Sequence, residues 1–135
     1  MSGYRFGRSL KPLRHPRFWC AMWCIAIAVV WVFSLMPPPP MPDFDSSDKV
    51  SHFLAYFVLA CCAVQLFRNW AGLLGAGLGL VLMGIAVEYA QGALTDDRMM
   101  DAKDALANTL GVVAGLATRL TPLRDLLLRI DGRRE

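Results

Sequence analysis

Four long apolar runs dominate this chain and limit what it can fold into. They cover residues 18–36, 49–67, 70–94 and 101–120. A run of about 20 apolar residues forms a helix long enough to cross the hydrocarbon core of a bilayer. We therefore predict an all-α fold, a polytopic membrane protein with a bundle of four transmembrane helices. The runs leave no room for a separate soluble domain, so residues 1–135 are expected to form a single membrane domain.

Composition supports the membrane assignment. Hydrophobic residues make up 56% of the chain and charged residues 19%, whereas a soluble domain is about half apolar and about a quarter charged. The net charge of +3 would by itself suit nucleic acid. However, the basic residues cluster beside the apolar runs, as membrane-flanking charges do. The expected partner is therefore the lipid bilayer, with no nucleic acid.

The segments between the runs predict where the helices begin and end. Residues 1–17 form a basic cytoplasmic segment that we expect to lie on an anionic membrane surface. Four consecutive prolines at 37–40 end the first helix, because proline has no backbone N–H to donate. Asp48 is expected to act as the N-cap or a first-turn residue of the second helix. Residues 121–135 open with an N-cap-like Thr-Pro pair and predict a short amphipathic helix at the interface.

Basic residues are distributed unequally between the two sides of the predicted bundle. Of the fourteen Lys and Arg residues, only Lys49, Arg98 and Lys103 fall on the side reached after the first and third helices. The positive-inside rule assigns the side with the excess of basic residues to the cytoplasm. Both termini are therefore predicted to be cytoplasmic, in a multi-pass protein of the inner membrane. Four crossings independently require the two termini to share a side.

The cysteines do not point to chemistry. They lie within the apolar runs and form no CxxC pair, at positions Cys20, Cys24, Cys61 and Cys62. We interpret them as buried, reduced thiols, and we exclude a redox motif or a thiolate metal site. The sequence also lacks a tight metal-binding motif such as HExxH, so no metal ion and no cofactor are expected.

A carboxylate near the end of the third run is the most informative single residue. A charged side chain at the bilayer centre costs about 2.5–3.5 kcal/mol, and less towards the interface, so Glu88 needs a partner, a proton or water. Gln91 lies one turn further on, and Gly77 and Gly84 share its helical face. Glycines allow a neighbouring backbone to approach, so this face is predicted to point into the bundle.

Glycine pairs at a spacing of four residues predict where helices pack closely. One pair, Gly75 and Gly79, lies in the third run, and the other, Gly111 and Gly115, lies in the fourth. Small residues at this spacing permit close contact between membrane helices. We expect both pairs to form such contacts.

Polar stripes on the neighbouring helices reach the same depth as Glu88. In the second run, His52 and Tyr56 follow Asp48 at spacings of four residues, so the three share one helical face. Helix two enters from outside, helix three ends there and helix four re-enters there. Their polar ends therefore meet at the outer-leaflet boundary. The predicted substrate-binding set is Asp48, His52, Glu88, Gln91, Arg98, Asp101, Asp104 and Asn108.

Simpler roles compete with binding for several of these residues. Asp48 and Asp101, at the starts of their helices, can be there simply to cap them, and Arg98 can be a solvated loop charge. We expect Arg98 to pair mainly with acidic residues at the start of the fourth helix. Glu88 is expected to bond to His52 or Asn108 from the neighbouring helices.

Three motifs occur in order along this region: DKVSHFLAYFVLA at 48–60, GIAVEYAQ at 84–91 and RMMDAKDALANTLGVVAG at 98–115. A proline-rich SLMPPPPMP precedes them. Together they resemble the VanZ-like family over residues 34–115. The resemblance implies a small bacterial membrane protein of the cell envelope, with a link to glycopeptide (teicoplanin) resistance in the family's namesake and no stated mechanism. The positions that match the family pattern are Asp48, Lys49, His52, Phe53, Glu88, Gln91, Arg98, Asp101, Asp104, Asn108 and Gly111.

Two classes of function fit these residues. The first is a non-enzymatic envelope protein whose outer polar pocket binds a lipid-linked cell-wall precursor or a lipoglycopeptide antibiotic. The second is a membrane-embedded enzyme in which Glu88 and His52 supply acid–base chemistry and Asp104 or Asp101 orients the base or holds a divalent cation. Proton-coupled transport is a third and weaker hypothesis, because four short helices leave little room for a transport pathway. Whether the protein is an enzyme stays open at this stage.

Overall fold

The computed structural model describes residues 9–36, 44–94 and 102–132, and the side chains of residues 44–48 are not among those described. All the named elements of the described chain are helices, and its β structure is limited to two isolated bridges, so the all-α prediction is confirmed. The elements are α1 (Pro16–Leu35), α2 (Phe44–Leu66), α3 (Trp70–Leu94), α4 (Ala102–Ala117), the short 3-10 helices η2 (Thr118–Leu120) and η3 (Pro122–Asp125), and α5 (Leu126–Asp131).

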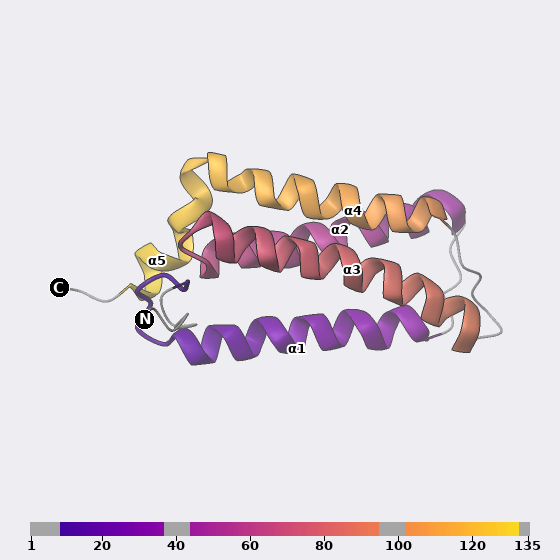
Figure 1. Ribbon diagram of the computed structural model, residues 1–135, viewed down its shortest axis with the longest axis horizontal. Helices are drawn as coiled ribbons and strands as arrows, with labels where there is room; N and C mark the ends of the chain where they lie inside the picture. Colours follow the sequence, from indigo (N-terminus) through magenta and orange to yellow (C-terminus); the bar gives the residue numbers. More distant parts are fainter. Residues whose placement is uncertain (1–8, 37–43, 95–101, 133–135) are drawn as a thin grey trace.

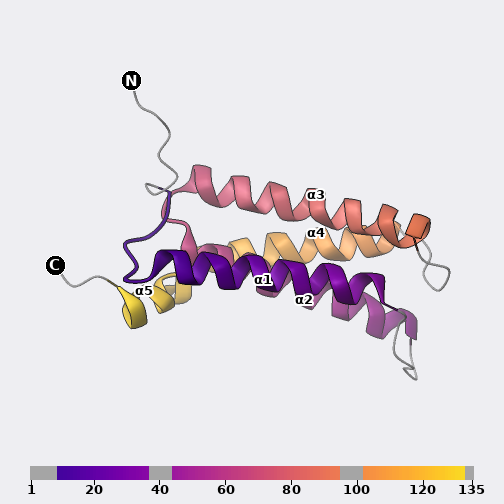
Figure 2. The ribbon, with the colours of Figure 1, turned by 90° about the horizontal axis from the view of Figure 1, so that it is seen from below.

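The four long helices lie side by side with their axes along the length of the molecule (Figure 1). Helices α2 and α4 share the most extensive interface, α3 packs on α4, and α1 covers α2 and α3. The view from below shows α5 folded against the end where α1 begins (Figure 2). The start of α2, the end of α3 and the start of α4 all lie at the opposite end (Figure 1).

Three helices are long and apolar enough to cross a membrane: α1, the part of α2 from Lys49 to Leu66, and α3. Helix α1 has no fully buried residue, and it exposes apolar side chains such as Ile25 and Val32. Apolar surface on this scale is typical of a lipid-facing helix rather than of a soluble one. The chain is therefore a membrane protein. Helix α4 has 16 residues and spans about 24 Å, and η2 continues it by about 6 Å.

The helix boundaries match the sequence prediction only in part. Residues 70–94 form α3 as expected. Helix α2 begins at Phe44, earlier than predicted, so Asp48 is its fifth residue rather than its N-cap or a first-turn residue, whereas the span Lys49–Leu66 that could cross a membrane begins where the predicted run does. Aspartate and serine are well tolerated at this end, where backbone N–H groups are free and the helix dipole is positive. At the other end of the chain, the Thr121 side chain does cap η3, accepting a hydrogen bond from the backbone N of Leu123 at 3.3 Å.

Only one of the two predicted glycine pairs mediates helix packing. A Cβ atom at Gly115 would lie 2.5 Å from the Ala60 Cβ and 2.7 Å from the Phe57 carbonyl oxygen, and Gly111 is equally close to α2. The pair Gly75 and Gly79 has nothing within 4 Å of the same position, so this prediction is wrong.

Gly75 and Gly79 face away from the other helices because of how α3 is rotated about its axis. The buried residues of α3 recur at spacings of three and four. This row contains both the helix's packing glycines and its polar residues, and it excludes Gly75 and Gly79. Its members are Leu73, Gly77, Leu80, Gly84, Val87, Glu88 and Gln91.

The described part of the N-terminal segment packs against the end of α2. Lys11 N donates to the Leu66 carbonyl at 2.9 Å, and Arg68 N donates to the Ser9 carbonyl at 2.7 Å. The Leu13 side chain is 1% exposed, within a cluster that includes Leu66. Extended backbone needs hydrogen-bond partners, and the end of α2 supplies them. Residues 1–8 lie outside the described part of the chain.

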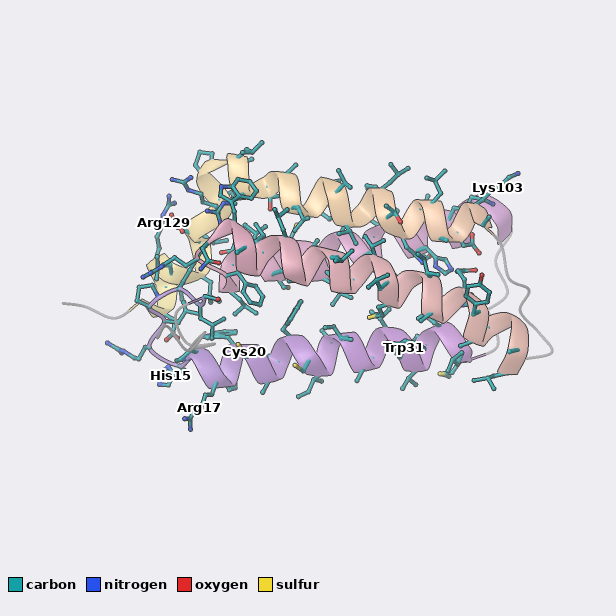
Figure 3. All side chains as sticks on the ribbon, viewed as in Figure 1. His15, Arg17, Cys20, Trp31, Lys103 and Arg129 are labelled. Atoms are coloured by element: carbon teal, nitrogen blue, oxygen red, sulfur yellow. The ribbon has the colours of Figure 1, made fainter. Side chains whose placement is uncertain are left out.

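The last described residues, in and after α5, pack against the start of α1 at the same end of the molecule. Asp131 accepts hydrogen bonds from Trp19 Nε1 at 2.9 Å and from the backbone N of His15 at 3.1 Å. The hydrogen bond from Trp19 and those from His15 hold the pKa of the Asp131 carboxyl below its usual range. His15, Arg17 and Arg129 all lie at this end, and Lys103 lies at the other (Figure 3). The C-terminal helix is thus anchored to the protein itself.

Candidate functional site

The start of α2, the end of α3 and the start of α4 lie at the end of the bundle opposite α5 (Figure 1), and buried polar side chains from these three helices form a cluster. Glu88 and Gln91 come from the last two turns of α3, and both are buried. Asp104 and Asn108 come from successive turns of α4, and His52 comes from α2. Gly84 opens the space for this meeting, since a Cβ there would lie 3.1 Å from the Asn108 Cβ.

His52 is the centre of the cluster. Its Nδ1 lies 3.0 Å from Asn108 Oδ1 and 3.9 Å from Glu88 Oε1, and its Nε2 lies 3.9 Å from Asp104 Oδ2. An amide oxygen can only accept, so Nδ1 carries the proton in the bond to Asn108. The two carboxylates flank opposite edges of one imidazole ring, and each is at ion-pair distance from it. A positive charge between them would be stabilised by both.

Two buried hydrogen-bond donors beside the cluster have no acceptor within the described part of the chain: the Tyr56 hydroxyl and Asn108 Nδ2. Tyr56 is 1% exposed and Asn108 is fully buried. Both side chains border Gly84, where a Cβ would lie 3.4 Å from Tyr56 Cε1 and 3.3 Å from Asn108 Nδ2. A buried donor without an acceptor costs about 1–3 kcal/mol, so native structures usually supply one. Both groups can donate to an oxygen atom of a bound molecule.

The same cluster contains one set of potential metal ligands. His52, Glu88 and Asp104 each offer one atom, and these atoms lie within 4.8 Å of one another. Imidazole nitrogen and carboxylate oxygen suit transition metals such as Zn²⁺. However, Glu88 is nearest Nδ1, which Asn108 already engages, whereas Asp104 is nearest Nε2. The two carboxylates thus flank the imidazole ring, with 3.9 Å approaches to different nitrogens, while one ring nitrogen and one oxygen from each carboxylate still lie within 4.8 Å of one another.

Other members of the predicted substrate-binding set lie elsewhere. Gln91 is buried, but its Nε2 donates to the Ser34 carbonyl at 2.7 Å, so it fastens α1 to α3. Arg98 and Asp101 lie outside the described residues, as does the side chain of Asp48, and the expected pairing of Arg98 with acidic residues lies outside them too.

The expected partnership of Glu88 and His52 is present at ion-pair distance. The sequence placed Tyr56 on the same helical face as His52 but did not include it in the predicted substrate-binding set. The structure buries Tyr56 against Gly84, next to Asn108.

No family model, no curated protein and no solved structure matches this chain. The VanZ-like resemblance therefore rests on the sequence motifs alone.

Proposed function

We propose that this chain is a multi-pass protein of the bacterial inner membrane with four transmembrane helices and both termini in the cytoplasm. The arrangement of the helices supports this topology. The end of the bundle with α5 carries Arg14, Arg17, Arg68 and Arg119 (Figure 3 labels Arg17), whereas the buried cluster comes from the helix ends opposite α5. Together α4 and η2 span about 30 Å, close to the thickness of the hydrocarbon core.

Reporter fusions test this topology directly. A reporter inserted after Asp45, in the first turn of α2, or after Asp97, beyond the end of α3, is expected to give an extracytoplasmic signal, because both positions lie on the side where an outward helix ends and a returning helix begins. A fusion at the C-terminus is expected to give a cytoplasmic signal and serves as the control. A cytoplasmic signal at either internal position would contradict four crossings.

We further propose that the buried cluster receives a polar group of a lipid-linked cell-envelope component, with a lipoglycopeptide such as teicoplanin as a related ligand. The observation that carries this proposal is the pair of buried donors, Tyr56 and Asn108, that have no acceptor within the described chain. Hydroxyl, carbonyl and phosphate oxygens on such a ligand would accept from them. The VanZ-like motifs support an envelope role, because they imply a link to glycopeptide susceptibility.

A second candidate function, acid–base catalysis on the same substrate, is favoured by the placement of His52 between two carboxylates. His52 would act as the general base, and Asp104 or Glu88 would orient the imidazole and stabilise its protonated form. The 3.9 Å separations are long for direct hydrogen bonds. Catalytic contacts often shorten only when the substrate is bound.

Replacing Glu88 with Gln separates the two functions, because it keeps the shape and removes the ionisable group. For binding, we expect ligand affinity and teicoplanin susceptibility within about twofold of wild type. For acid–base catalysis, we expect an activity loss of about 10²-fold or more. The measurements are teicoplanin susceptibility of cells expressing each protein, and ligand-induced thermal stabilisation of the purified protein.

The matched control is Tyr89→Phe, which alters an exposed neighbour on the same helix. Expression of each variant is checked by immunoblot. Wild-type protein that neither changes susceptibility nor responds to any lipid-linked precursor would contradict both candidate functions.

A further inference from the structure

A second polar feature lies at the end of the bundle that carries α5, away from the buried cluster. It is a cavity of about 280 Å³, close to the lower end of the range of about 300–1,000 Å³ for small-ligand sites. Its charged lining comes from four separate segments: the N-terminal segment, the turn between α2 and α3, η2 and η3. The four cations and one carboxylate that line it are Lys11, Arg68, Arg119, Arg124 and Asp125.

The single carboxylate does not neutralise this cavity. Asp125 pairs with Lys11 at 3.0 Å and, more weakly, with Arg124 at 3.6 Å. The Lys11 ammonium, together with the nearby arginines, keeps the pKa of Asp125 below its usual range, so Asp125 is ionised and engaged at neutral pH. Within the described residues, no carboxylate forms an ion pair with Arg68 or Arg119. An excess of positive charge is therefore left facing the cavity.

Part of this charge is held in place before any ligand binds. The Arg119 guanidinium lies 4.4 Å from the centre of the Trp70 ring, and its Nη1 donates to the Arg68 carbonyl at 3.1 Å. The Lys11 side chain is buried, and Nζ also donates to the Arg124 carbonyl. Fixing these side chains in advance reduces the entropy that a ligand must offset.

We propose that this cavity binds a phosphate group, and that the phosphate belongs to the headgroup of an anionic phospholipid. Arginine presents a planar set of donors that matches phosphate oxygens, and basic pockets between membrane helices bind anionic headgroups. Exposed apolar side chains neighbour the lining arginines: Trp70, which lies against Arg119, is 48% exposed, and Leu120 and Leu123, which adjoin Arg119 and Arg124 in the chain, are 78% and 59% exposed. Such side chains suit the boundary between headgroups and acyl chains, where aromatic and aliphatic groups contact lipid.

The site is independent of the function proposed for the buried cluster, because the two lie at opposite ends of the bundle. Lipid bound here would tie together the N-terminal segment, the α2–α3 turn and η3. The shared chemistry, a phosphate on arginine side chains, would also accept free inorganic phosphate. The experiment must therefore distinguish the two sources.

The test uses purified full-length protein titrated with phosphatidylglycerol, with phosphatidylcholine, or with inorganic phosphate. Retained lipid is counted by native mass spectrometry, and thermal stability is followed in parallel. The variant is Arg68→Gln with Arg124→Gln, and its control is Arg14→Gln with Arg17→Gln, an equal charge change at the same end of the molecule outside the cavity. The double variant is expected to bind phosphatidylglycerol about thirtyfold more weakly, corresponding to about 2 kcal/mol, and the control about as well as wild type.

Arg68→Gln alone is the fallback variant, because no described side-chain hydrogen bond or ion pair involves Arg68. It is expected to weaken binding about fivefold. If both double variants lose phosphatidylglycerol binding equally, then general surface charge binds the lipid, and the proposal that the cavity is the site is overturned. A different result is that inorganic phosphate stabilises the wild-type protein at the same concentration as the lipid and fails to do so in the cavity variant alone. That result would support a phosphate site and overturn the lipid as the source of the phosphate. Equal binding of phosphatidylcholine would overturn the proposal.

Discussion

Replacing Gly111 with leucine is expected to prevent the protein from reaching its folded state. A Cβ atom at this position would overlap the Phe53 carbonyl oxygen and lie 3.1 Å from the Phe57 nitrogen. Both are backbone atoms of α2, so a rotamer change cannot relieve the contact. Overpacking a tight interface costs about 1–3 kcal/mol when side chains can move, and more when they cannot. We expect a loss of at least about 3 kcal/mol.

The control is Gly79→Leu on α3, where a Cβ would meet nothing within 4 Å. It adds the same side chain to a lipid-exposed face, and we expect its folded yield to match that of wild type. Leu116→Ala, which only removes contacts, is expected to lower the yield less than Gly111→Leu does. Folded yield is measured as the monodisperse fraction after detergent extraction. Equal yields for the two glycine variants would show that α2 and α4 do not pack through this face.

Hydrophobicity and glycine spacing predicted the helical class and the bounds of α3, because long apolar runs have few alternatives in a membrane. They did not decide which glycines face a neighbour. Gly75 with Gly79 and Gly111 with Gly115 have the same spacing, and only the second pair is buried. The polar residues on α3 decide which of its faces is buried. Glu88 and Gln91 must avoid lipid, and the face that buries them contains Gly77 and Gly84 instead.

The core of the candidate site could be predicted from the sequence, because helix direction alone brings His52, Glu88 and Asp104 to one depth. The roles of its neighbours could not be predicted. Gln91 donates to a backbone carbonyl on α1, and no side-chain pattern reports such an acceptor. The cavity at the other end depends on Lys11 meeting Asp125, residues that are far apart in the sequence. That contact follows from how the termini pack, which local patterns do not encode.

Replacing His52 with leucine is expected to lower the free energy of unfolding by about 1–3 kcal/mol, the usual loss when buried polar groups are left without their partner. The substitution removes the imidazole that lies 3.9 Å from both Glu88 and Asp104, and it leaves Asn108 Oδ1 without its donor. The other histidine provides the control. His15 has a side chain that is 61% exposed and bonds Asp131 at the surface, so His15→Leu is expected to cost less than about 1 kcal/mol.

A triple variant distinguishes ionic coupling from loss of packing. If the cost of His52→Leu comes from stranded carboxylates, then adding Glu88→Leu and Asp104→Leu should restore most of the lost stability, because apolar replacements of a buried ionic group are often neutral or stabilising. If the cost comes from packing alone, the added substitutions should lower stability further. The measurement is thermal unfolding in one detergent at fixed pH. Equal stability of His52→Leu and His15→Leu would mean that the cluster is not electrostatically coupled. A stable but inactive triple variant would show that its charges are retained for function rather than for folding.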